Sequence, residues 1–116
     1  MKYVIMVYET ENAFRARSDE QHRARYWGAY KAYSQAIKDA GVAAGGHALQ
    51  PPFSATTVRV TSGARKVQDG PYAETKEQLG GFFVVDVPDL DAALEWASRC
   101  PAAAEGAVEV RPVLSM

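Results

Sequence analysis

The sequence predicts an α+β fold, a ferredoxin-like split βαβ sheet with an inserted β-hairpin. Two helical segments and four main strand segments follow one another in the order β-α-β-β-α-β, which is typical of that fold. Two shorter strand segments around Ser62 and Gly63 form the inserted hairpin. A chain of 116 residues is the size of one domain with a buried core, so we expect a single domain over residues 1–116.

The first strand and the first helix have clear signals. Residues 2–8 (KYVIMVY) are apolar and rich in strand-forming side chains, which predicts a buried strand. A helix is predicted over residues 19–40, because Ser18 and Gln21 fit a capping box, no proline interrupts the segment and Gly41 stands at its C-terminal cap. One stripe of this helix is mainly aromatic and comprises His22, Tyr26, Tyr30, Tyr33, Ile37 and Ala40.

The middle of the chain predicts a weak strand and the hairpin. Residues 42–49 form a strand loosened by its glycines, which ends at Pro51-Pro52. Residues 56–60 (TTVRV) form a strand that turns at Ser62-Gly63 and returns through Lys66 and Val67.

The C-terminal half predicts a strand, a helix and a last strand. Residues 82–87 (FFVVDV) form the most apolar strand of the chain, and residues 107–113 form an alternating one. Asp89 can cap a helix that extends to about Arg99, before Pro101. The predicted buried face of this helix carries Leu90, Leu94 and Ala97.

Charge, cysteine content and apolar stretches indicate which partners and which location to expect. The 13 Lys and Arg side chains against 14 Asp and Glu give a net charge of −1, so neither nucleic acid nor a membrane surface is an expected partner. Cys100 is the only cysteine, which fits a reducing compartment. Neither a signal peptide nor a membrane-spanning apolar stretch is apparent, so we expect a cytoplasmic protein.

Two strands are apolar on both faces, which predicts a homodimer. In the first strand, Tyr3, Ile5 and Val7 point to one side and Val4, Met6 and Tyr8 to the other. The strand over residues 82–87 is likewise apolar on both sides, except at Asp86. Helices on one side of a sheet leave the second side open, and a large exposed apolar patch is uncommon on a monomer. A second copy can cover that face; alternatively, the hairpin and loops fold over it within one chain.

Residues 69–101 carry a family resemblance. The run DGPYAETKEQLGGFFVVDVPDLDAALEWASRCP resembles the signature of the DGPF-type branch of the YCII-related proteins, with Tyr72 in place of the motif's phenylalanine. The likeness extends from the MKY-type first strand to the closing VEVRPV. It implies a dimeric α/β barrel of ferredoxin-like protomers, a site with a histidine and an aspartate, and a regulatory link to extracytoplasmic-function sigma factors.

His22 and Asp69 are the candidate catalytic pair. A histidine in the first turn of the predicted helix would tend to be neutral and available as a base, and the family pattern has its proposed site histidine there. Asp69 would orient His22 or His47 as the carboxylate of a His–Asp pair. The alternatives are a half-exposed histidine at a helix end and an aspartate that only hydrogen-bonds the backbone of its turn.

Four further residues are candidates for substrate binding. Lys76 could anchor an anionic or phenolic oxygen and Glu74 could carry a proton, because the glycines at 80 and 81 permit another group to approach closely. The alternative is a solvated loop. Tyr26 could stack on a planar ligand, although an aromatic stripe is also typical of a core or dimer interface. His47 could meet His22 in one pocket, yet two histidines without a ligand spacing do not predict a metal site.

These observations lead to two functional hypotheses. The first is a small cytoplasmic lyase or isomerase without a cofactor, with His22 as general base, Asp69 as its orienting carboxylate and Lys76 as an anion-binding group. The second is a non-catalytic dimer that binds a small ligand or a protein, such as a sigma factor, in regulation. No metal and no cofactor is expected for either.

Overall fold

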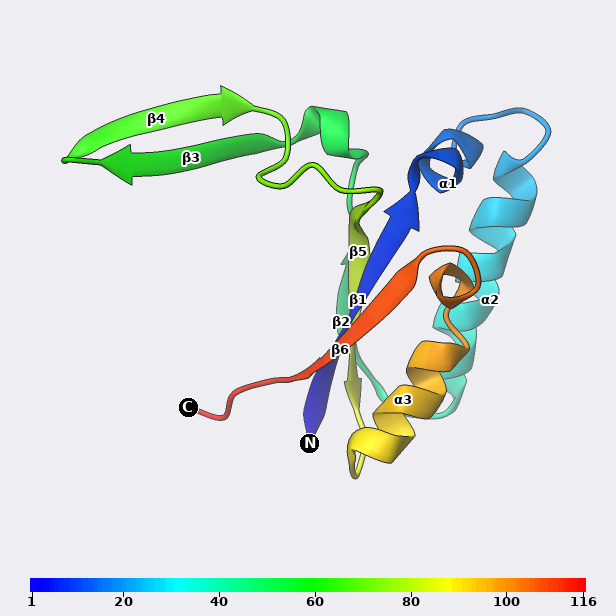
Figure 1. The fold of residues 1–116 in the computed structure, drawn as a ribbon. Coiled ribbons are helices and arrows are strands. Elements are labelled where there is room, and N and C mark those ends of the chain that lie inside the picture. Colours follow the sequence, from blue (N-terminus) through cyan, green and yellow to red (C-terminus); the bar gives the residue numbers. More distant parts are fainter.

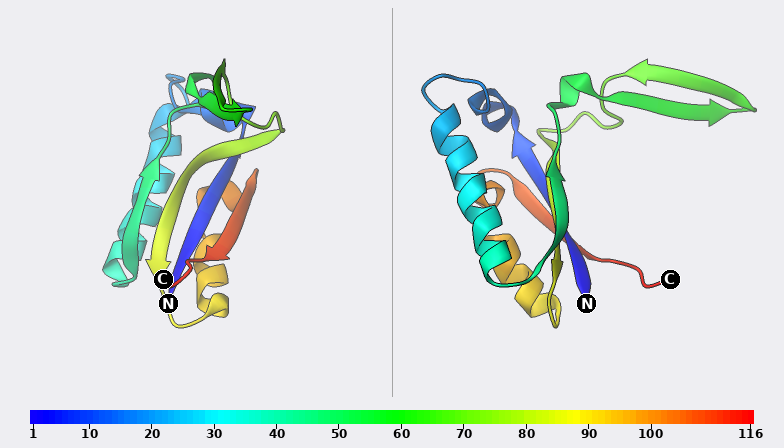
Figure 2. Two further views of the ribbon diagram at one scale, coloured as in Figure 1. Left: turned by 90° about the vertical axis from the view of Figure 1, so that its left-hand side faces the viewer. Right: turned by 180° about the vertical axis from the view of Figure 1, so that it is seen from behind.

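Four antiparallel strands form the main sheet of the computed structural model, which describes residues 1–116 (Figure 1). The sheet has the order β2-β5-β1-β6, with β1 (Lys2–Thr10), β2 (Ala43–Ala48), β5 (Glu77–Asp86) and β6 (Ala107–Pro112). Helices α2 (Arg23–Asp39) and α3 (Leu90–Ser98) lie on one face of the sheet (Figure 2). The remaining elements are α1 (Glu11–Ala16), β3 (Thr56–Thr61), β4 (Ala64–Asp69) and the 3-10 turns η1 (Pro52–Ser54) and η2 (Pro101–Ala103). The predicted α+β class is confirmed.

The core lies between the sheet and the two longer helices. Alternate residues of β1 face the helices, so Tyr3, Ile5 and Val7 are buried. They pack with Tyr33 and Ile37 of α2, with Ala93 and Ala97 of α3, and with Val85 of β5. Burial of these apolar side chains is the main stabilising term of the domain.

The first long helix begins later than predicted. α2 starts at Arg23, and its N-cap His22 makes no capping hydrogen bond through its side chain. Ser18 and Gln21 lie in the turns that precede the helix, so they form no capping box. The end is as predicted, because Gly41 adopts a φ of 74° that a residue with a side chain disfavours.

Helix α1 was not predicted from the sequence. It follows β1 directly and has six residues, too short for a clear apolar period. Thr10 caps it, because the Thr10 hydroxyl accepts a hydrogen bond of 3.2 Å from the backbone N–H of Ala13. Phe14 is its buried residue.

The predicted cap of α3 and the predicted burial of Ala97 are confirmed, but Leu90 and Leu94 do not face the core. The carboxylate of Asp89 accepts a hydrogen bond of 2.9 Å from the backbone N–H of Ala92. Ala93 and Ala97 are buried, whereas Leu90 and Leu94 are about half exposed. Small side chains let a helix lie close to a sheet, so the alanine stripe and not the leucine stripe faces the core.

Strand β5 begins earlier than predicted. It starts at Glu77, which pairs with Thr10 of β1, so the second half of the polar stretch 69–81 is strand. Only residues 70–76 connect the hairpin to β5.

The predicted hairpin is present and projects from one end of the sheet, on the side away from the helices (Figure 1). Ser62 and Gly63 form its turn with φ values of 52° and 77°, the backbone of a two-residue hairpin loop. Val58, Val60 and Val67 on the hairpin are exposed. The hairpin therefore does not fold over the second face of the sheet, which was the alternative to a dimer.

The second face of the sheet carries no helix, and its central strands β1 and β5 are apolar there. We call it the open face; β1 and β5 contribute Val4, Met6, Tyr8, Phe82 and Val84, all half-buried, and the edge strand β6 adds the ion pair of Glu109 and Arg111. The strands of one chain form no closed barrel, because β2 and β6 are the two free edges. None of the helices combines the length and the apolar character needed to span a lipid bilayer.

Candidate functional site

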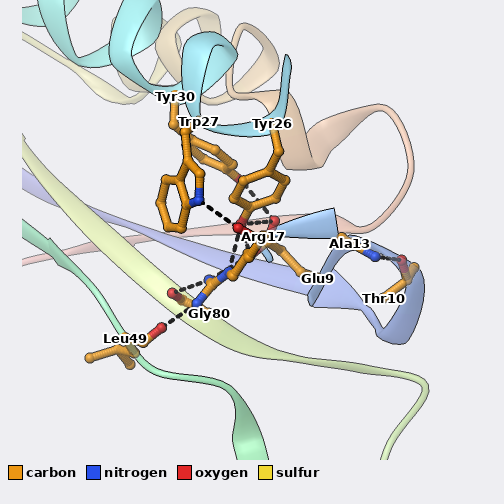
Figure 3. Close-up of polar contacts among 9 residues, drawn as sticks. All are labelled: Glu9, Thr10, Ala13, Arg17, Tyr26, Trp27, Tyr30, Leu49 and Gly80. Carbon is orange, nitrogen blue, oxygen red and sulfur yellow. Dashed lines mark hydrogen bonds and ion pairs between the residues drawn. The ribbon is translucent and has the colours of Figure 1, made fainter. Parts of the chain in front are cut away.

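A buried carboxylate lies near the end of β1. Glu9 has the same inward orientation as Val7 and is only 3% exposed. A buried charge is costly unless it is paired and hydrogen-bonded. Glu9 meets both conditions, because Arg17 Nη2 lies 2.9 Å from Oε1, the Tyr26 hydroxyl 2.7 Å from each oxygen and the Tyr30 hydroxyl 3.1 Å from Oε2 (Figure 3).

Arg17 joins this carboxylate to three other parts of the chain. Its Nε donates to the Tyr26 hydroxyl at 2.9 Å, its Nη2 to the Gly80 carbonyl at 3.0 Å and its Nη1 to the Leu49 carbonyl. Burial alone would lower the pKa of Arg17, but the hydrogen bonds to Tyr26 and Glu9 outweigh it and raise that pKa. The guanidinium is therefore a permanent cation that ties α2, β1, β5 and the end of β2 together.

Aromatic rings surround the guanidinium of Arg17. Its central carbon lies 4.8 Å from the centroid of the Phe14 ring, 5.6 Å from that of Tyr26 and 5.4 Å from that of Trp27. These distances are in the range of cation–π contacts. The indole N–H of Trp27 also donates to the backbone carbonyl of Arg17 at 3.0 Å (Figure 3).

The glycine pair of β5 is explained by the chain itself. A Cβ on Gly80 would lie 2.6 Å from Glu9 Oε1 and 3.0 Å from Arg17 Nη2, and a Cβ on Gly81 would lie 2.8 Å from the His47 carbonyl. The sequence predicted a ligand or a partner chain as the close neighbour of these glycines. The neighbours are instead a buried ion pair and strand β2.

The two tyrosines of the cluster are hydrogen-bond donors. Burial, and then the neighbouring Glu9 carboxylate, raises the pKa of Tyr26 and of Tyr30 well above the ordinary value. Both hydroxyls therefore stay protonated near neutral pH. They can orient a neighbouring oxygen but cannot act as bases.

Two cavities share Glu9, Tyr26 and Tyr30 as a common wall. The first, which we call the His22 cavity, has a volume of about 1000 Å³ and lies among α1, the start of α2 and η2. The second, which we call the α2–β2 groove, has a volume of about 590 Å³ and lies between α2 and strands β2 and β5.

His22 lies at the rim of the His22 cavity. Its side chain is 65% exposed, and its Nδ1 is in hydrogen-bond contact with the carboxylate of Asp19, three residues earlier. This hydrogen bond lowers the pKa of Asp19. Arg25 borders the same cavity from α2. The chain thus forms a His–Asp pair, but the carboxylate beside His22 is Asp19 and not Asp69.

Asp69, Glu74 and Lys76 lie elsewhere. Asp69 is the last residue of β4, pairs with Thr56 in the hairpin and is exposed. Glu74 and Lys76 are exposed in the connection before β5. None of the three borders either cavity. The chain does not bring them next to His22.

His47 and His22 do not meet. The ring of His47 packs against that of Phe82 with 5.9 Å between centroids, and Phe82 stands opposite Met6 of β1. The His47 ring therefore lies on the open face, although the residue also borders the α2–β2 groove. Tyr26, in contrast, borders both cavities.

Glu9 and Arg17 were missed as site residues. The alternation of β1 places Glu9 in the inward register after Tyr3, Ile5 and Val7, and this signal could have identified it. A charged residue in a buried register needs a partner of opposite charge. Arg17 carries no comparable signal, because it belongs to a turn.

Comparison with known proteins places the whole chain in one family. The family model described as "YCII-related domain" matches residues 1–116. An uncharacterised protein of Rhizobium meliloti (strain 1021) is 36% identical over 115 residues, which cover 97% of this chain and 92% of that protein.

Proposed function

The chain belongs to the YCII-related family, and we propose that it is a cofactor-independent acid–base enzyme for a small substrate bound in the His22 cavity. The observation that carries this proposal is the contact between His22 and Asp19 at the rim of that cavity. A carboxylate on one ring nitrogen fixes the tautomer of an imidazole and leaves the other nitrogen for the substrate. His22 Nε2 is therefore the atom that takes the proton.

The proposed reaction is a proton transfer without a redox step. His22 Nε2 takes a proton from a carbon next to a carbonyl, and the electron pair moves to the carbonyl oxygen. Arg25 lies one turn along the same helix and can stabilise that oxyanion. The imidazolium, stabilised by Asp19, then returns the proton to a different carbon or to a leaving group. The outcome is an isomerisation or an elimination.

Glu9 is assigned a supporting role. Its oxygens are engaged by Arg17, Tyr26 and Tyr30, so it holds the common wall of the two cavities in place. Tyr26 would contribute its ring to the substrate cavity, in line with its predicted role as a binding residue.

The test uses NMR to measure the incorporation of deuterium from the solvent into small oxo acids, which have a carbon next to a carbonyl. We expect exchange with the wild type and its loss in His22→Gln, with a partial loss in Asp19→Asn. Asp69→Asn is the matched control, because Asp69 is the other candidate carboxylate. Exchange that survives in His22→Gln, or that depends on Asp69 and not on Asp19, would contradict the proposal.

We further propose that the protomer is ferredoxin-like and forms a homodimer through its open face. The strand order β2-β5-β1-β6, with two helices on one face, supports the first part. The apolar open face supports the second, because sheet-to-sheet contact would remove it from water. Membership of the DGPF-type branch and a cytoplasmic location stay predictions from the sequence.

A second candidate function is non-catalytic protein binding in regulation, such as the predicted link to a sigma factor. The exposed Val58, Val60 and Val67 of the projecting hairpin favour it. Apolar side chains on a projecting arm are typical of a surface that meets a partner. A protein that only binds would show no deuterium exchange with any oxo acid.

A further inference from the structure

The α2–β2 groove has one wall built from a single stripe of α2. Trp27, Lys31, Ser34 and Lys38 follow one another at helical spacing and all border the groove. Val7, Ile37 and Phe83 supply apolar surface deeper in the groove. This stripe differs from the one that contains His22, and neither lysine borders the His22 cavity.

The opposite wall is open because β2 lacks bulky side chains there. On β2, Gly46 stands opposite Phe83 and so lies on the side that faces α2, and its φ of 145° is one that L side chains rarely adopt. A Cβ on Gly46 would lie only 2.6 Å from the Phe82 carbonyl of the neighbouring strand. Backbone geometry thus keeps Gly46 free of a side chain, and the other residues of β2 in this register, Ala43 and Ala48, are small. The space between α2 and β2 therefore stays unfilled.

The charge of the groove is positive. Its charged lining residues are Glu9, Arg17, Lys31 and Lys38. Glu9 and Arg17 neutralise each other at 2.9 Å, whereas neither lysine takes part in any of the ion pairs of the chain. Two cations therefore remain at the groove without an acidic partner.

We propose that the α2–β2 groove binds a small organic anion with an aromatic or aliphatic body. The volume of about 590 Å³ is that of a small-molecule site, in which apolar walls and a few polar groups are typical. The apolar body lies along Ile37 and Phe83, where it can also meet the exposed ring of Trp27. The anionic group lies between Lys31 and Lys38. This site is distinct from the His22 cavity and does not depend on the reaction proposed there.

The charge selectivity can be measured with two fluorescent probes of similar shape. Anilinonaphthalene sulfonate carries an anionic group on an aromatic body, and N-phenylnaphthylamine is its neutral counterpart. In the double variant Lys31→Gln, Lys38→Gln, we expect affinity for the sulfonate to fall about tenfold and affinity for the neutral probe to stay unchanged. The matched control is Lys66→Gln, Lys76→Gln, which removes two exposed lysines outside the groove and should leave both affinities unchanged.

The location of the probes needs its own variant, because the open face is also apolar. Ser34→Trp fills the groove from α2 and should abolish binding of both probes, whereas His22→Gln should leave both unaffected. Circular dichroism and thermal unfolding check that each variant is folded. Binding that survives in a folded Ser34→Trp variant, or sulfonate affinity unchanged by loss of both lysines, overturns the proposal. Loss of deuterium exchange in His22→Gln with probe binding intact separates this site from the proposed reaction.

Discussion

Arg17 holds the buried carboxylate of Glu9 at 2.9 Å and, with the same terminal nitrogen, donates to the carbonyl of Gly80 on the neighbouring strand. One guanidinium thus links a carboxylate of β1 to the backbone of β5. Glu9 also belongs to the common wall of the His22 cavity and the α2–β2 groove, and Arg17 borders the groove. Whatever changes this contact should affect both folding stability and the shape of two cavities.

We expect Arg17→Met to lower the free energy of unfolding by about 3–5 kcal/mol, because it leaves Glu9 buried without a cation. Arg15→Met is the matched control. Arg15 pairs with Glu11 at 2.6 Å on the surface, and such exposed pairs contribute about 0–1 kcal/mol. Denaturant unfolding measures both changes. Similar losses in the two variants would show that burial of the Glu9–Arg17 pair has no special role.

Two glycine substitutions should act in opposite directions. Gly80→Ala places a Cβ 2.6 Å from Glu9 Oε1, so we expect a loss of about 1–3 kcal/mol from the displacement of the buried pair. The Cβ added by Gly28→Ala, within α2, would have no contact within 4 Å. This substitution should therefore stabilise the protein by about 0.5–1 kcal/mol through helix propensity. Thermal unfolding of both variants measures the difference. A neutral Gly80→Ala would contradict the close contact.

The class of fold could be predicted from the sequence, because the spacing of apolar residues indicates which side chains are buried. The alternation in β1, the cap at Asp89 and the turn at Ser62-Gly63 are local signals, and each is present in the structure. The start of α2 was placed too early, since a capping box is only a pattern and Ser18 lies in a turn. The buried face of α3 depends on how closely that helix approaches the sheet, which no local signal determines.

The candidate site was less predictable, because it depends on tertiary contacts. His22 and Tyr26 were identified, and both border the larger cavity. The partner of His22 was sought in the DGP turn, but a carboxylate three residues before it on the same chain segment is nearer. Arg17 contacts Glu9 because the turn after α1 brings the chain back over the end of β1. Residue types alone do not predict this path of the chain.

The loss of folding stability at acid pH should depend in part on the protonation of Asp19. Its hydrogen bond with His22 lowers the pKa of Asp19 in the folded state, so the stability from this contact is present above the unfolded pKa of about 3.9 and is lost as pH falls through the lowered value. In His22→Gln we expect the carboxyl pKa to return toward its ordinary value, as measured by NMR titration. Asp86 is the internal control, because the N-terminal ammonium group 2.9 Å away lowers its pKa independently of His22.

Cys100 should react slowly while the protein is folded. Burial raises the pKa of its thiol to about 11, so at neutral pH the folded thiolate fraction is roughly 300-fold below that of an exposed cysteine with a pKa of about 8.5. The rate with a disulfide reagent, with and without denaturant, measures this difference. Because the unfolded thiol ionises first, stability should fall as pH rises from about 8.5 toward the folded value. Equal rates in both states would contradict burial of Cys100.

The open face should determine the assembly state. If two copies bury it against each other, light scattering of the wild type gives about twice the chain mass of 12.6 kDa. Met6→Glu places a charge in the middle of that face and should yield single chains, because an unpaired carboxylate is costly to bury. Leu94→Glu changes an exposed position of α3 on the helical side and should leave the mass unchanged. Wild-type particles of one chain's mass would mean that water, and not a second copy, covers the open face, and the proposed dimer would have to be given up.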